Sequence, residues 1–124
     1  MGKLDIPGTT KTPAIRSDDS TGFIEIKGRA HPENAKEFFK PLIDWATEYA
    51  KNPQEKTTVN IDLEHFNTSS SKCILDFFKQ LEPLKKPPND IIVNWYYEDD
   101  DEELLEAGET YEAITGFKFR LIGV

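Results

Sequence analysis

Four consecutive hydroxyl residues, Thr68 to Ser71, follow Asn67 in the segment HFNTSSSKCILDFF, between an alternating stretch and an amphipathic one. A helix needs only one or two such side chains at its start, because one N-cap side chain accepts a hydrogen bond from a free backbone N–H. One of Asn67, Thr68 or Ser69 is enough for that cap. The rest of the row follows the carboxyl end of a predicted strand, where ligands and modifications concentrate in α/β sheets.

Phosphorylation is the chemistry that suits this row of hydroxyls. The first turn of a helix offers unpaired N–H groups and the positive end of the helix dipole, and both favour a phosphate. Lys72, four residues after Thr68, lies on the same helical face and could supply a counter-charge. The spacing therefore indicates a regulatory phosphosite, but it does not choose Thr68 over Ser69 or Ser70.

The other reactive residue types have simpler explanations. His31 and His65 are far apart in the sequence and lack the spacing of metal ligands, so we expect them in surface or packing roles. Cys73 falls on the apolar side of a predicted helix, which favours a buried structural thiol over a reactive one. The sequence has no Gly-rich phosphate loop, nucleophile elbow or paired cysteines for zinc, and it predicts no catalytic residue and no cofactor.

The acidic run from Glu98 to Glu103 leaves two interpretations open. Its carboxylates could bind a hard divalent cation, which would make the chain a metal- or ligand-binding protein. The simpler interpretation is that they favour the positive end of a helix dipole. Because the run lacks the alternating ligands and the glycine of a calcium loop, we predict capping and no metal site.

Composition limits the class of protein further. The chain has 124 residues, which predicts one domain over 1–124. Its 23 acidic and 15 basic side chains give a net charge of −8, which argues against binding to nucleic acid or to an anionic membrane surface. The single cysteine excludes an internal disulfide, and no apolar stretch resembles a leader or a membrane span. We therefore expect a cytoplasmic protein.

The elements that would position the hydroxyl row alternate along the chain. Residues 1–12 are expected to be a loosely held segment, in which Leu4 and Ile6 could form a brief edge strand. Residues 14–27 predict a hairpin around the turn SDDSTG. Pro41 should kink or split the first helix. Helices are predicted at 32–52, from about 69 to the prolines of LKKPPND, and at 101–114, and strands at 57–66, 91–98 and 117–124.

Alternation along these strands predicts the layers of the fold. Strands separated by helices usually pair in parallel through right-handed crossovers. A parallel sheet covered on both faces would have continuous apolar strands, whereas Val59, Ile61 and Leu63 alternate with polar residues. We therefore predict a two-layer α/β domain. It has a mixed sheet with an N-terminal hairpin, all helices on one face and a more polar open face.

Four blocks of sequence together resemble the SiaC family of bacterial regulatory phosphoproteins: KTPAI, HFNTSSSKCILDF, VNWYYEDDDEELLEAGE and FRLI, within about Leu4 to Val124. The resemblance implies a fold similar to the STAS domains of anti-anti-sigma factors, and a partner-switching protein rather than an enzyme. It singles out Thr68 as the phosphorylated residue. It also implies that four neighbours shape the site for the kinase and partner: Asn67, Ser69, Ser70 and Lys72.

The same resemblance implies the partners. A dedicated Ser/Thr protein kinase would phosphorylate the threonine and a PPM-type phosphatase would reverse the reaction. In one branch of the family the unphosphorylated form binds and activates a diguanylate cyclase, which raises cyclic di-GMP and promotes biofilm formation or aggregation. Because the family is wider than that pathway, the resemblance also allows an effector protein other than a diguanylate cyclase.

Overall fold

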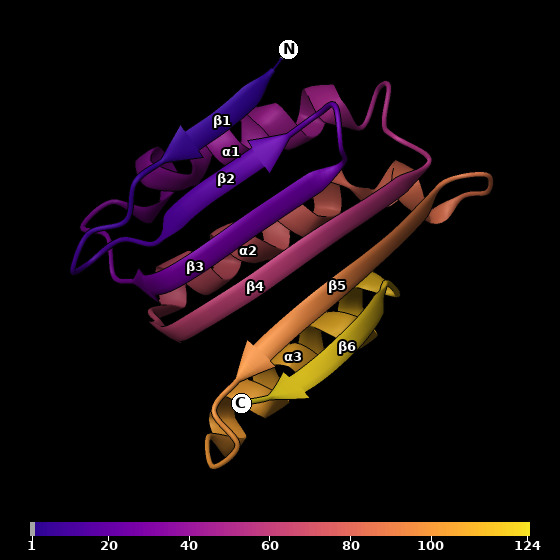
Figure 1. The fold of residues 1–124 in the computed structure, drawn as a ribbon. Coiled ribbons are helices and arrows are strands. Elements are labelled where there is room, and N and C mark those ends of the chain that lie inside the picture. The colour runs from indigo at the N-terminus through magenta and orange to yellow at the C-terminus, as the bar shows by residue number, and fades with distance from the viewer. Residues whose placement is uncertain (1) are drawn as a thin grey trace.

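Alternating apolar side chains produce a sheet that is buried on one face only. The computed structural model describes residues 2–124, so that Met1 of the predicted N-terminal segment lies outside it. Six strands form one sheet in sequence order, antiparallel between the first three and parallel from the third to the sixth (Figure 1). The strands are β1 (Lys3–Ile6), β2 (Ala14–Asp18), β3 (Phe23–Ala30), β4 (Lys56–Phe66), β5 (Asp90–Tyr97) and β6 (Lys118–Gly123).

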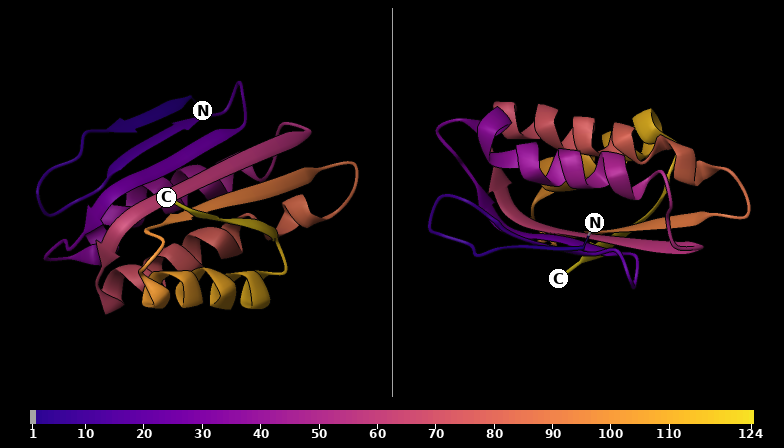
Figure 2. Two further views of the ribbon diagram at one scale, coloured as in Figure 1. Left: turned by 60° about the horizontal axis from the view of Figure 1, so that its bottom comes forward. Right: turned by 90° about the horizontal axis from the view of Figure 1, so that it is seen from above.

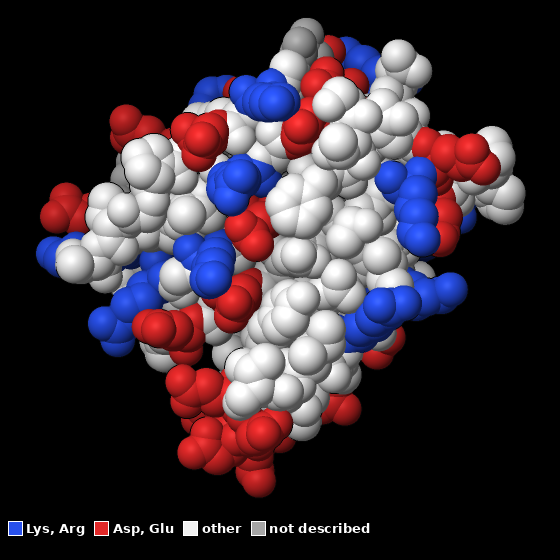
Figure 3. All heavy atoms as spheres, viewed as in Figure 1, with Lys and Arg blue, Asp and Glu red and all other residues white. Residues whose placement is uncertain are grey.

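All the helices pack on the same face of this sheet, as Figure 2 shows from two further directions. They are α1 (Ala35–Tyr49), α2 (Thr68–Gln80), α3 (Glu102–Thr115) and the short 3-10 helix η1 (Glu82–Lys85). The other side, called the open face below, carries charges of both signs around an uncharged band (Figure 3). This arrangement confirms the predicted two-layer fold with its mixed sheet and hairpin. Within residues 2–124, no helix is long and apolar enough to cross a membrane.

The core lies between the sheet and the helices. Odd-numbered residues of β4 and β5 point into it, and Val59, Ile61, Val93 and Trp95 are each 0% exposed. The helices meet them with side chains that include Phe39, Leu42, Ile74, Phe77 and Phe78, all 0% exposed. Burial of such side chains is the main favourable contribution to folding.

Two details of the predicted helices differ in the structure: the split at Pro41 does not occur, and the second helix ends earlier. Helix α1 is not split at Pro41, which lies inside it with an exposed side chain. The carbonyl that loses its partner there belongs to Glu37, which is also exposed, so water can satisfy it. Helix α2 ends at Gln80, earlier than predicted, and the short helix η1 follows it. Leu84 is buried as expected, but it belongs to η1 and not to α2.

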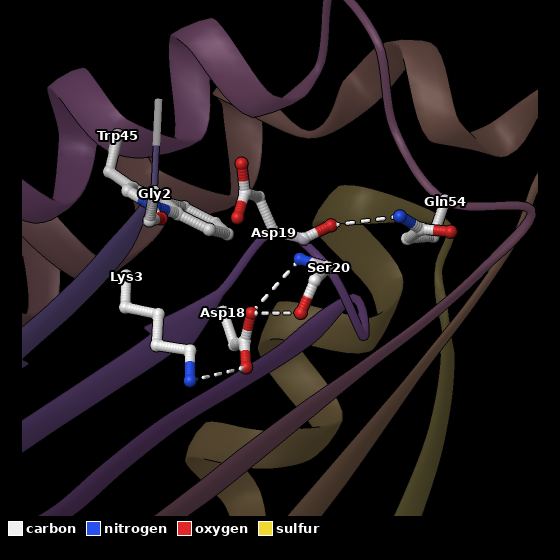
Figure 4. Close-up of polar contacts among 7 residues, drawn as sticks. All are labelled: Gly2, Lys3, Asp18, Asp19, Ser20, Trp45 and Gln54. Carbon is white, nitrogen blue, oxygen red and sulfur yellow. Dashed lines mark hydrogen bonds and ion pairs between the residues drawn. The ribbon is translucent and has the colours of Figure 1, made fainter.

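The N-terminal segment, which was predicted to be loosely held, makes several contacts with the rest of the fold (Figure 4). β1 forms the expected edge strand and pairs with β2 over four residues. The indole N–H of Trp45 donates to the carbonyl of Gly2 at 2.8 Å, and Lys3 lies 3.7 Å from Asp18. In the turn after β2, Ser20 donates to the Asp18 carboxylate through its hydroxyl and backbone N–H, and these bonds lower the pKa of Asp18.

Helix α3 approaches β5 closely because Gly108 has no side chain. A Cβ at Gly108 would lie 2.6 Å from Cδ1 of Trp95. The indole cannot move away freely, because Trp95 is 0% exposed and its Nε1 donates to the carbonyl of Leu104 at 2.9 Å. The Trp95 ring therefore fixes the position of α3 on the sheet.

Gly108→Ala tests this close packing. Alanine is normally preferred over glycine inside a helix by about 1 kcal/mol, but overpacking against the fixed indole costs about 1–3 kcal/mol. We expect the variant to lower the free energy of unfolding, measured by urea denaturation. The exposed neighbour substitution Glu109→Ala should change it by less than about 0.5 kcal/mol. A more stable Gly108→Ala protein would show that the helix can shift.

Candidate functional site

The candidate site forms where β3 and β4 end side by side. The parallel register shifts between Gly28 and Arg29, so that Gly28 lies opposite Leu63 and Arg29 opposite His65. This bulge adds one residue to β4 and changes the direction in which the chain leaves the sheet. Gly28 has a φ of 125°, which favours glycine. After the strands end, the N–H of Asn67 still donates to the carbonyl of Ala30 at 3.0 Å.

Asn67 is the N-cap of α2, one of the three candidates from the sequence. Its side-chain oxygen accepts a hydrogen bond from the N–H of Ser70 at 2.8 Å, and its carbonyl accepts from the N–H of Ser71 at 3.0 Å. The cap thus needs no hydroxyl from the row. All four hydroxyl residues lie inside the helix, which begins at Thr68.

Thr68 combines an exposed side chain with a fixed backbone. Its carbonyl accepts a hydrogen bond from the Ser71 hydroxyl at 2.8 Å. The carbonyl of Ser71 in turn accepts from the hydroxyl of Tyr111 on α3, also at 2.8 Å. Burial raises the pKa of Tyr111 to about 12, so this phenol remains a donor at neutral pH. Helix α3 therefore holds the first turn of α2 while the Thr68 hydroxyl stays accessible.

Three of the four predicted neighbours contribute to the surface or cap of the site. Ser69 and Lys72 are exposed and line a hollow of about 370 Å³ between the starts of α1 and α2, called the α1–α2 hollow. Asn67 supplies the cap. Ser70 differs, because its side chain is 0% exposed and its hydroxyl has no hydrogen-bond partner among the described residues. Ser70 therefore lies beneath the surface on which Thr68 is exposed.

A second hollow, of about 250 Å³, lies between the end of β4 and the start of α3. His65, Phe66 and Leu104 line it, together with carboxylates that include Asp101 and Glu103. Asp101 is the N-cap of α3, and its carboxylate accepts from the N–H of Leu104 at 3.0 Å. This confirms the capping interpretation for one member of the acidic run. Among residues 2–124, no three His, Cys, Asp or Glu side chains are arranged to hold a metal ion.

The structure brings together two histidines that the sequence separates by 34 positions. Nδ1 of His65 lies 2.7 Å from Nε2 of His31, and the ring planes differ by 8°. Rings stacked face to face could not bring two atoms so close, because their planes stay about 3.5 Å apart. The rings therefore meet edge to edge through one N–H···N hydrogen bond. This pair connects the segment that leads into α1 with the segment that leads into α2.

The sequence offers only a partial signal for this pair: each histidine lies at the carboxyl end of a strand, and the two strands are predicted to be parallel, but the register that brings the rings together comes from tertiary pairing. Cys73, by contrast, is where the sequence placed it. Its side chain is 4% exposed, and burial raises the pKa of the thiol. This agrees with a structural thiol beneath the α1–α2 hollow.

Comparison with known proteins places this site in context. The family model described as "SiaC family regulatory phosphoprotein" matches residues 6–124. An uncharacterised protein of Pseudomonas aeruginosa strain UCBPP-PA14 is 31% identical over 121 residues, which cover 98% of this chain and 96% of the relative. The similarity therefore extends over nearly the whole of both chains.

Solved structures agree with the sequence comparison. The crystal structure of apo-SiaC from P. aeruginosa superposes with a TM-score of 0.88 at 31% identity, covering 99% of this chain and 100% of that one. A chain from the crystal structure of the diguanylate cyclase SiaD in complex with its activator SiaC, also from P. aeruginosa, gives a TM-score of 0.89 at 30% identity. That match covers 98% of this chain and 99% of the other.

Asn67→Ala should destabilise the start of α2. Loss of an N-cap side chain costs about 1 kcal/mol, because the N–H of Ser70 loses its acceptor. Urea denaturation measures the change. Asn52→Ala, at an exposed position after α1, is the matched control and should be nearly neutral. Equal losses for the two variants would contradict the capping role of Asn67.

Ser70→Ala should stabilise the protein. A buried hydroxyl without a partner costs about 1–3 kcal/mol in desolvation, and alanine removes that cost without leaving a large cavity. Ser69→Ala is the control, because it makes the same exchange one residue earlier with an exposed side chain. The difference between the two unfolding free energies isolates the buried hydroxyl. A Ser70→Ala protein that is less stable than Ser69→Ala would show that the hydroxyl is satisfied in solution.

Proposed function

The chain belongs to the SiaC family of regulatory phosphoproteins, and from this premise we propose that it is a partner-switching protein controlled at Thr68. In this proposal it is not an enzyme. A Ser/Thr protein kinase phosphorylates Thr68, a PPM-type phosphatase removes the phosphate, and the unphosphorylated protein binds and activates a diguanylate cyclase in the cytoplasm. The cyclase then raises cyclic di-GMP and with it biofilm formation or aggregation.

The observation that supports this proposal most is the exposure of Thr68 on a hydrogen-bonded turn, with Phe66 two residues before it lining one hollow and Ser69 directly after it lining the other. The α1–α2 hollow contains Ser69 and Lys72, and the hollow beside α3 contains His65 and Phe66. A partner that covers either hollow would come close to the Thr68 hydroxyl. The related SiaC of P. aeruginosa is described as the activator of the cyclase SiaD, which supports a cyclase as the effector here.

Phosphorylation would change the surface more than the fold. A phosphothreonine carries about −1.5 to −2 charges and three acceptor oxygens. At the first position of α2 the helix dipole and free N–H groups tolerate this charge, and Lys72 lies one turn further along the helix. The partner, however, meets added bulk, a charge to desolvate and repulsion of its own carboxylates. We therefore expect the phosphate to exclude the partner without unfolding α2.

Thr68→Ala and Thr68→Glu test this switch. Titration calorimetry with the purified diguanylate cyclase of the same organism should give unchanged affinity for Thr68→Ala and at least a tenfold loss for Thr68→Glu, or about 1.4 kcal/mol. Thr47→Glu adds the same charge at an exposed site on α1, where the native hydroxyl contacts Gln80 at the far end of α2. That control should bind normally.

Equal affinity of Thr68→Ala and Thr68→Glu for the cyclase would contradict the proposed switch. Intact-mass measurement of protein purified from its native cells provides an independent test, because it does not depend on which effector is chosen. A single phosphate that Thr68→Ala lacks supports the proposal. The reverse pattern, a phosphate that persists in Thr68→Ala, would contradict Thr68 as the phosphorylated residue.

A further inference from the structure

The open face carries a group of cations at the end remote from Thr68. Lys56 begins β4, and Lys118 and Arg120 are alternate residues of β6. These three side chains, called the basic corner below, line a hollow of about 360 Å³. Figure 3 shows Lys and Arg gathered near the end of the sheet where β5 begins, next to an uncharged surface. In a chain of net charge −8, such a local excess of positive charge is unexpected.

Among its lining residues the basic corner has a single carboxylate, Asp90, which lies opposite Lys56 in the strand register. Five other cations of the described chain lie within 4.0 Å of an acidic oxygen: Lys3, Arg29, Lys40, Lys51 and Lys85. None of the basic-corner residues forms such a pair among residues 2–124. With Asp90 counted, the formal local charge is three minus one, or +2. Mutual repulsion of these cations is relieved when an anionic group binds between them.

The floor of this hollow is partly apolar. Strand register places Thr58, Ile92 and Lys118 in one row across the sheet, and Asn94 lies beside Arg120 in the next. Ile92 is only half-buried, since all the helices cover the opposite face. The floor continues into half-buried Tyr96 on the same strand face. Cations around an apolar floor fit carboxylates that are interspersed with apolar side chains.

We propose that the basic corner is a docking surface for an acidic segment of a partner protein, which binds whether or not Thr68 is phosphorylated. β4 separates the two sites, because it starts at Lys56 and ends at Phe66, just before Thr68. Its 11 residues span roughly 35 Å at about 3.3 Å per residue. This distance is several times the screening length of about 8 Å at physiological salt, so phosphate charge at Thr68 does not reach the basic corner.

The chemistry of the hollow favours a protein segment over other anions. A compact phosphate is usually held by free backbone N–H groups at a helix start or a nest. Here the floor residues Thr58, Ile92 and Asn94 lie on the interior strands β4 and β5, which pair with a neighbour on both sides, and none of the helices of the described chain starts at the hollow. A long nucleic acid would be repelled by the remaining surface of this acidic chain. Carboxylates spaced along a peptide match cations that come from two different strands.

A short fluorescein-labelled peptide rich in Glu and Leu is the probe for this surface. Fluorescence anisotropy should show binding to the full chain that weakens as salt is raised. The triple variant Lys56→Gln, Lys118→Gln and Arg120→Gln should bind at least about tenfold more weakly. The charge-matched control changes three exposed lysines of the helical layer: Lys40→Gln, Lys51→Gln and Lys79→Gln. It should bind as the unmodified protein does, and so should Thr68→Glu.

Three results would overturn this proposal. Equal affinities of the two triple variants would show that the peptide responds only to overall charge. Displacement of the peptide by equimolar inorganic phosphate would indicate a small-anion site. Self-association in sedimentation velocity that disappears in the basic-corner variant would make a second copy of this chain the occupant. Because the assay uses no cyclase and no phosphate at Thr68, its failure would leave the switch at Thr68 untouched.

Discussion

The parallel alignment of β3 with β4 determines where the candidate groups lie. Both strands run in the same direction and each leads into a helix on the same face, so α1 and α2 begin side by side at one edge of the sheet. The bulge after Gly28 sets the final register, and the hydrogen bond from Asn67 to Ala30 keeps it beyond the last strand residues. The Thr68 turn, both neighbouring hollows and the histidine pair all lie at this edge.

The sequence determined the layers of the fold through alternation, which burial on one face requires. It could not determine the course of α1 at Pro41, because the cost of a missing hydrogen bond depends on whether water reaches Glu37. The contact between His31 and His65 depends on strand register, which only tertiary pairing sets. The end of α2 likewise depends on η1, whose Leu84 continues the apolar stripe with a different helical period.

The inward position of Ser70 could have been predicted from the helix period, but the row of hydroxyls presents Ser70 only as a candidate for phosphorylation. The buried stripe of α2 includes Cys73, Ile74 and Phe77, and Ser70 lies three and four residues before the first two. Four consecutive residues cover more than one full turn of a helix, so one member had to face the core. What spacing could not do was choose Thr68 among the remaining hydroxyls. That choice came from family resemblance, and the structure adds an exposed side chain on a fixed backbone.

In a switch of this kind, phosphorylation would change the affinity for a partner while leaving the stability of the fold nearly unchanged. In the proposed switch, a phosphate at the start of α2 would meet the favourable end of a dipole, so the fold would have little reason to change. The same phosphate would lie near two hollows that a partner could cover, where its charge would have to be desolvated. If phosphorylation changes the free energy of binding rather than the free energy of unfolding, the protein remains folded in both states, and removal of the phosphate restores binding. The rigid support of Thr68 by Ser71 and Tyr111 matters for this reason, because a mobile turn could move the phosphate away from the partner.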